Sequence, residues 1–132
     1  MKFQALAGVG VVAAILAAPA NAHHSFAMFD HSVTSSLTGT VKEFEWINPH
    51  AWIHVLVMNA DGQATTWSFE AGSTGQLTQA GWKRDDIRVG DTNKIGFHPL
   101  KDGSFGGQVL TVVTPDGKEL CQGNGCQVRN GG

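Results

Sequence analysis

After residue 36 the chain alternates between apolar and polar residues in short blocks, which is the pattern of strands with one buried face. Turn signals separate the blocks, and Asp61-Gly62 is a strong hairpin turn among them. The blocks predict five strands, over Leu37–Ile47, Ala51–Met58, Ala64–Glu70, Thr92–His98 and Gly107–Thr114. Apolar side chains at alternating strand positions are expected to form the core: Ile53, Val55, Trp67, Phe69, Ile95 and Phe97.

Between the third and fourth of these strands the pattern changes to helical spacing. Ser73 can cap the start of a short helix, and Gln76 occupies the reciprocal position of a capping box. Leu77 and Ala80 would give the helix an apolar side, and Gly81 is a suitable residue to end it.

The order of these elements is three strands, one short helix and two strands. Antiparallel strands in this order must protect their edges, and closing into a small barrel does so. An OB-type barrel carries its helix between the third and fourth strands. We therefore predict an all-β fold, an OB-like five-stranded barrel over residues 37–120, with an open β-sandwich as the alternative.

The first 22 residues predict a cleavable signal peptide. Lys2 supplies a positive start, Ala5–Ala18 is apolar, and Ala20-Asn21-Ala22 is a cleavage site of small residues. The alternative is a membrane anchor, but the apolar run is shorter than the roughly 20 residues that a span needs. We expect a periplasmic or secreted protein that begins at His23, with residues 23–36 as an arm and no later membrane span.

The charge of the expected mature chain argues against a nucleic-acid partner. Once Lys2 is removed, 8 basic and 11 acidic residues remain, a formal charge of −3. Proteins that bind nucleic acids present a basic surface, so we expect no such partner.

The two cysteines, Cys121 and Cys126, lie close together near the C-terminus. In an oxidising compartment such a pair favours a disulfide, which would close a flexible tail over residues 121–132. A thiolate metal site is the alternative, although a lone pair lacks the other ligands of such a site.

Three short segments contain most of the histidines of the chain and two of its tryptophans. They are the start His23–Phe26 (HHSF), the segment Glu45–Trp52 (EWINPHAW), and His98–Gly103 (HPLKDG), which Gly106-Gly107 follows. Together they resemble the DUF6152 family of small exported bacterial proteins of unknown function. The resemblance spans nearly the whole expected mature chain, and it implies no established activity.

The expected topology suggests where a site would lie. In an OB-type barrel the loops after strands one and four flank the binding face, and these loops hold His50 and His98. The alternative is that each histidine only orders its own loop through hydrogen bonds. The same loops supply the residues of a predicted ligand-binding rim: Trp46, Asn48, Trp52, Lys101 and Asp102.

His23 adds a possible chelate, because cleavage would free its α-amine beside its own imidazole. With a third nitrogen from His50 or His98, and His24 as a spare donor, this set would suit a transition metal, with copper favoured. The alternative is a disordered tail that happens to begin with histidine. No motif of a known catalytic machinery is present, so we expect a metal-binding protein or, alternatively, a non-catalytic module for a small organic ligand or an envelope protein. A third alternative, an enzyme that uses a histidine-bound metal for redox chemistry, would need a metal site with an open position and is the less favoured one.

Overall fold

Every predicted strand is present in the computed structural model, which describes residues 26–130. Strand β3 has the predicted bounds, and the other four differ from the prediction by one or two residues at one or both ends. The elements in chain order are η1 (Phe26–Met28), β1 (Ser35–Glu45), β2 (Trp52–Met58), β3 (Ala64–Glu70), α1 (Thr74–Gln79), β4 (Thr92–Pro99), β5 (Gly106–Val113), β6 (Glu119–Cys121) and α2 (Asn124–Asn130).

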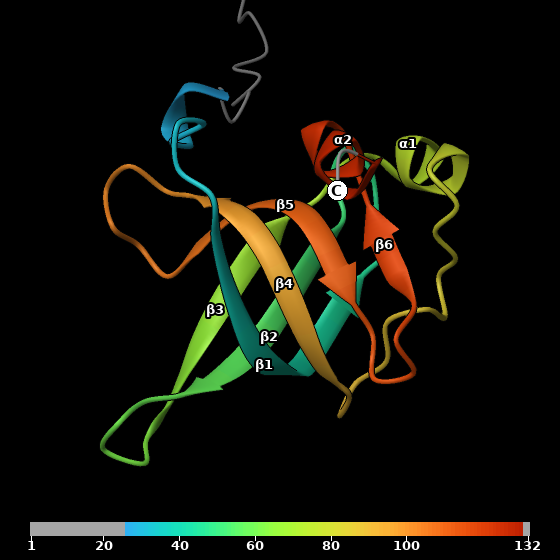
Figure 1. Ribbon diagram of the computed structural model, residues 1–132. Helices are drawn as coiled ribbons and strands as arrows, with labels where there is room; N and C mark the ends of the chain where they lie inside the picture. The colour runs from blue at the N-terminus through green and yellow to red at the C-terminus, as the bar shows by residue number, and fades with distance from the viewer. Residues whose placement is uncertain (1–25, 131–132) are drawn as a thin grey trace, which may run out of the picture.

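The first five strands close into a barrel (Figure 1). Strands β3, β2, β1, β4 and β5 pair in that order, and all these pairs are antiparallel. A short parallel pairing between β3 and β5, with Ser68 opposite Gly106, completes the circle. This is the OB-like arrangement that the sequence predicts, and the closed ring excludes the open sandwich.

Strand β1 serves both sides of the barrel. Its first half pairs with β4 and its second half with β2, and the register shifts between Val41 and Glu43. Such a bulge bends a strand and increases its twist, which suits the tight curvature of a small barrel.

The barrel interior holds the predicted core. Five of the six predicted core residues are at most 3% exposed: Ile53, Val55, Phe69, Ile95 and Phe97. The sixth, Trp67, is partly buried, with its ring against Phe69, Phe97 and Phe105.

Helix α1 forms as its capping residues predict. The Ser73 hydroxyl accepts a hydrogen bond from the Gln76 backbone N–H, and the Gln76 side chain accepts one from the Ser73 N–H. Leu77 is fully buried, and the helix is followed by Gly81 with a φ of +91°. The capping box stabilises the start of this six-residue helix, and the burial of Leu77 in the core holds it over one end of the barrel (Figure 1).

The C-terminal segment is ordered where a loose tail was expected from residue 121. Cys121 ends β6, which pairs with β5, and it forms the predicted disulfide with Cys126. The Trp82 indole N–H donates to the Cys121 carbonyl at 2.8 Å, and both residues are buried. The segment is held because its backbone completes the hydrogen bonding of a buried indole, a contact that no local pattern reveals.

The part of the predicted arm that the structure describes is attached to the barrel. Phe29 is buried and forms a β-bridge with Leu100. The Asp30 N–H donates to the Pro99 carbonyl, and the Lys101 N–H donates to the Met28 carbonyl. The predicted signal peptide, His23 and His24 lie outside the described residues. Within residues 26–130 the helices are too short or too polar to cross a membrane.

Candidate functional site

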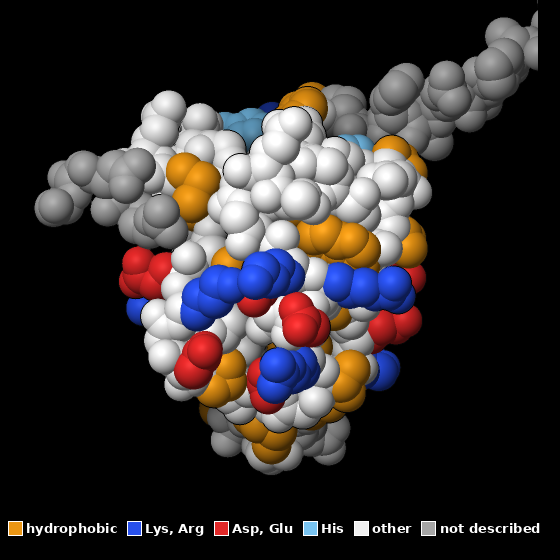
Figure 2. Space-filling model, turned by 90° about the vertical axis from the view of Figure 1, so that its right-hand side faces the viewer, with side chains coloured by type: hydrophobic (Ala, Val, Ile, Leu, Met, Phe, Trp, Pro, Cys, Tyr) orange, Lys and Arg blue, Asp and Glu red, His pale blue; other side chains and the backbone are white. Residues whose placement is uncertain are grey.

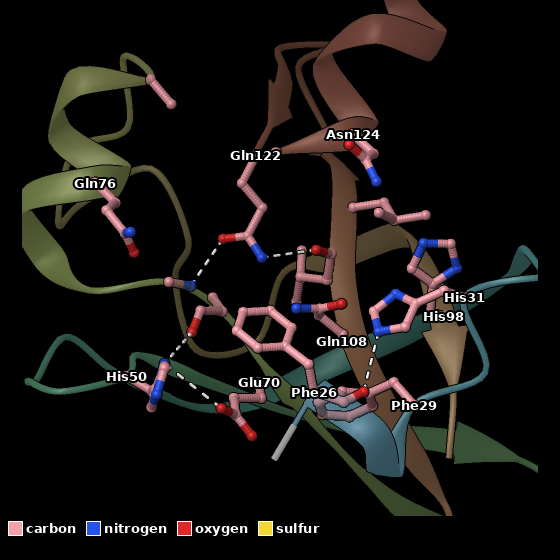
Figure 3. A pocket seen from close by; sticks show the side chains of 16 residues that line it. Phe26, Phe29, His31, His50, Glu70, Gln76, His98, Gln108, Gln122 and Asn124 are labelled. Atoms are coloured by element: carbon pink, nitrogen blue, oxygen red, sulfur yellow. Dashed lines mark hydrogen bonds and ion pairs between the residues drawn. The ribbon is translucent and has the colours of Figure 1, made fainter. Parts of the chain in front are cut away.

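A pocket of about 670 Å³ lies at the end of the barrel that carries the helices (Figures 1 and 3). Its walls come from the arm, from the loops next to β2 and β3, from α1, from β4 and β5, and from the turn after β6. The residues that line it are Phe26, Phe29, His31, His50, Glu70, Ala71, Gly72, Gln76, Ala80, His98, Gln108, Val109, Leu110, Gln122, Gly123 and Asn124.

One wall of the pocket pairs His50 with Glu70. The His50 Nδ1 lies 3.2 Å from the Ala71 carbonyl oxygen and 3.5 Å from Glu70 Oε1. A carbonyl oxygen can only accept, so Nδ1 carries the hydrogen and Nε2 of the neutral ring keeps its lone pair. The side chain of His50 is 40% exposed, so this nitrogen is within reach of a ligand.

Glu70 is the unusual member of this wall. Its side chain is only 8% exposed, and its Oε2 is buried without a hydrogen-bond partner among the described residues. Buried polar atoms are nearly always hydrogen-bonded, because an unsatisfied one costs roughly 1–3 kcal/mol. Because Glu70 also lines the pocket, its carboxylate is a candidate contact for a ligand.

A second pair of side chains, His31 and His98, lies on the other side of the pocket (Figure 3). The His98 Nδ1 is 2.7 Å from the Val33 carbonyl oxygen, and the His31 Nε2 is 3.0 Å from the Phe26 carbonyl oxygen. Each ring thus donates one N–H to the backbone and keeps a lone pair on its other nitrogen. The ring centres are 4.9 Å apart, with an interplanar angle of 70°.

The side-chain amide of Gln122 connects segments on two sides of the pocket. The Gln122 amide accepts from the Gly72 N–H at 2.8 Å and donates to the Val109 carbonyl at 2.7 Å. Gln122 thereby ties the turn after β6 to the segment after β3, and the disulfide between Cys121 and Cys126 encloses that turn. This part of the pocket wall is therefore held in place by hydrogen bonds and a disulfide.

The residues predicted for a rim lie elsewhere, although His50 and His98 do line one pocket. Trp46 packs against Phe44 with ring centres 5.8 Å apart. The Asn48 Oδ1 accepts from both the backbone N–H and the hydroxyl of Thr74, so Asn48 joins its loop to α1. Trp52 stacks on His54 with an interplanar angle of 4°.

The two predicted rim residues of the β4–β5 loop, Lys101 and Asp102, are exposed and away from the pocket lining. The Asp102 carboxylate accepts a hydrogen bond from the Ser104 backbone N–H, which lowers the pKa of that carboxyl. This contact is an Asx turn that shapes the loop.

His54 belongs to a separate hydrogen-bonded group outside the pocket. Its Nδ1 lies 2.7 Å from the Ser68 hydroxyl and its Nε2 3.0 Å from Glu45 Oε2. Both ring nitrogens are therefore satisfied by neighbouring strands, as expected for a sheet histidine.

The predicted metal ligands are brought only partly together. Within residues 26–130, no three histidine, cysteine or carboxylate side chains are grouped closely enough to hold a metal ion. Figure 3 places His50 on the opposite side of the pocket from His98. His23 and His24, the remaining predicted donors, lie outside the described residues.

Among the histidines and carboxylates that line the pocket, sequence inspection missed two, His31 and Glu70. His31 lies in an arm with no periodic pattern, so only the folded arm reveals its contact with His98. Glu70 gave a usable signal, because it ends β3 opposite Trp52, directly beside the loop that holds His50.

The family model for DUF6152, described as a family of unknown function, matches residues 11–109. The chain belongs to this family. A search of curated proteins gives no match. Among solved structures, the chain is similar to the mitochondrial single-stranded DNA-binding protein Rim1 of S. cerevisiae, at 13% identity and a TM-score of 0.46, over 69% of this chain and 96% of that one.

The absence of a nucleic-acid partner stays a prediction based on charge. On the face of the barrel shown in Figure 2, lysine and arginine side chains are interspersed with aspartates and glutamates. Lys118 also pairs with Asp86 at 2.6 Å. Mixed positive and negative charges of this kind do not favour binding of a phosphate backbone.

Proposed function

We propose that this member of the DUF6152 family is exported and binds a transition-metal ion, with copper favoured, at the wall formed by His31 and His98. The observation that carries the proposal is this pair of imidazoles, each with one N–H held by a backbone carbonyl and the other nitrogen free to coordinate. Histidines that bind metals almost always donate their second ring N–H in this way, because the bond fixes the orientation of the ring.

The separation of the rings suits a shared ion. A metal–nitrogen distance of ~2.0–2.1 Å puts the centre of a coordinating imidazole ~3.2 Å from the ion. Two such rings at an angle of about 90–110° at the ion have centres ~4.5–5.2 Å apart. The observed 4.9 Å lies within that range.

Further ligands would come from the processed N-terminus. Phe26 lines the pocket, and His23 lies three positions before it, so the α-amine of a chain cleaved after Ala22 lies within ~11 Å of Phe26. An α-amine and an imidazole of His23, together with His98 and His31, form an all-nitrogen set, and nitrogen ligands favour Cu(II) in the usual order of affinities. In this proposal His31 takes the place that the sequence gave to His50.

Calorimetric titration of the processed protein with Cu(II) tests the proposal. We expect His31→Ala and His98→Ala each to weaken binding at least ~10-fold, a loss typical when a metal site is disturbed. An extra alanine before His23 should weaken binding as well, because it moves the α-amine away from the imidazole. The matched control is His54→Ala, since both ring nitrogens of His54 are already engaged outside the pocket.

The decisive variant is His31→Ala, because His31 is exposed and its removal leaves the barrel core intact. Copper binding that is the same in wild type, His31→Ala and His98→Ala would refute the proposed site. If the added alanine leaves copper binding unchanged while both histidine variants weaken it, the α-amine is not a ligand and the two imidazoles are.

A further inference from the structure

We propose that the opposite wall of the same pocket, built on Glu70 and His50, binds a small organic cation, namely a primary ammonium or amidinium group on an apolar skeleton. This site is separate from the proposed metal wall and does not depend on it. The first observation is the buried Glu70 carboxylate oxygen without a hydrogen-bond partner, on a pocket far larger than one ion.

The charge of the pocket selects for a cation. Glu70 is the only acidic side chain among the lining residues, and neither lysine nor arginine is among them. An organic anion would meet this carboxylate without a lysine or arginine beside it. A positive group is attracted to it, and more strongly because Glu70 is withdrawn from water.

The hydrogen-bonding groups on this wall are acceptors, so the ligand must supply the donors. Glu70 Oε2 can only accept, and the Nε2 of His50 is a lone-pair nitrogen, because Nδ1 donates to the Ala71 carbonyl. An ammonium has three N–H donors and an amidinium four, so either satisfies both acceptors. A hydroxyl or a neutral amide satisfies fewer of them and brings no charge.

The remaining lining indicates an apolar body for the ligand. Phe26 and Phe29 line the pocket from the arm, and Val109 and Leu110 line it from β5. Aromatic faces near a cation add an attractive term, and apolar walls with few polar contacts are typical of small-molecule sites. A hard metal cation is a poorer occupant, because such ions need six to eight oxygen ligands and this wall offers one carboxylate.

The test uses benzamidine and benzylamine as probes, with benzamide, benzyl alcohol and benzoate as matched controls. Titrations are followed by calorimetry in the presence of EDTA, so that bound metal plays no part. We expect the two cationic probes to bind at least ~10-fold more tightly than the three controls. Equal binding of benzamide and benzamidine, or no binding of either cation, would overturn the proposal.

The variant Glu70→Gln keeps the shape of the side chain and removes its charge, and we expect it to weaken benzamidine at least ~10-fold. The control is Glu43→Gln, which removes one exposed carboxylate from β1 and should leave binding unchanged. Equal losses in both variants would show that net charge, and not this wall, attracts the probe, and would overturn the site.

A measurement on the wild-type protein keeps the site testable should Glu70→Gln fail to fold. In ¹⁵N-labelled protein, benzamidine should change the amide chemical shifts of Ala71 and Gly72 more than those of residues around Ser68, which lie away from the pocket. Shifts confined to other surfaces would refute the location. Benzamidine binding is tested with Glu70→Gln and copper binding with His31→Ala, so this proposal and the metal proposal fail separately.

Discussion

The contact between Phe69 and Phe97 offers a quantitative test of the barrel core. These side chains are 0% and 3% exposed, and their ring centres are 4.8 Å apart with an interplanar angle of 54°. Truncation of a buried phenylalanine to alanine costs about 3–5 kcal/mol, through lost burial and the cavity that remains. We expect each of Phe69→Ala and Phe97→Ala to lower the free energy of unfolding by this amount.

The two substitutions should not be additive, because they remove rings that touch. A tilted aromatic pair contributes about 0.5–1.5 kcal/mol beyond the area it buries, and the double variant loses that contact only once. We therefore expect Phe69→Ala with Phe97→Ala to cost less than the sum of the two by roughly 1 kcal/mol. Leucine variants at both positions leave smaller cavities and should cost less than the alanine variants, so they complete the cycle if the alanine variants unfold.

Urea unfolding followed by tryptophan fluorescence measures these values. Trp67 is a suitable reporter because its ring lies 6.2 Å from that of Phe69 and 6.0 Å from that of Phe97. Phe26→Ala is the matched control, since Phe26 is 69% exposed and its loss should change stability by no more than about 0.5 kcal/mol. If Phe69→Ala and Phe97→Ala are as mild as this control, the assigned inward faces of β3 and β4 are wrong.

Three further predictions concern the ends of the chain and its response to acid. Sequencing the N-terminus of the exported protein should give His23 as the first residue, and a different start would remove the α-amine chelate. Replacing Cys121 and Cys126 with serine should cost at least about 2 kcal/mol in thermal unfolding, because the loop constraint is lost and a buried position in β6 gains a hydroxyl; an unchanged melting temperature would contradict this. Hydrogen bonds from the hydroxyl and the backbone N–H of Ser32 hold the pKa of Asp30 below its ordinary 3.8. Their stabilising effect is therefore present above pH 3.8 and is lost as the pH falls below it. In an NMR titration Ser32→Ala should raise the pKa of Asp30, and an unchanged pKa would show that the contacts are weak in solution.

Much of the fold was predictable because its signals are local. The alternation of apolar residues defined the strands, and Ser73 with Gln76 defined the start of α1 without any tertiary information. Strand β6 was missed because it has three residues, too few for an alternation to show, and because its burial depends on the distant Trp82. Patterns of this kind identify elements whose stability is encoded within one segment.

Only those residues of the candidate site that the barrel topology brings together could be predicted from the sequence. Placing the first and fourth loops at one end of a barrel brought His50 and His98 to one pocket. Trp52 was expected at the rim for the same reason, but the next residue, Ile53, faces the core, so the side chain of Trp52 lies on the outer face. His31 owes its place in the pocket to contacts between distant segments, which sequence alone does not reveal.

The long reach of strand β1 has a consequence for the order in which the molecule assembles. The β2–β3 hairpin joins Trp52 to Glu70 across 18 positions, whereas the β1–β4 ladder joins Ser35 to Phe97 across 62. Closing a longer loop costs more chain entropy and slows folding, so the hairpin should form first. Glu70 thus belongs to an early, local unit, while the contact between His31 and His98 forms only once the start of β1 lies beside β4. A ligand that binds both histidines would therefore bind the chain only after this long-range pairing has formed.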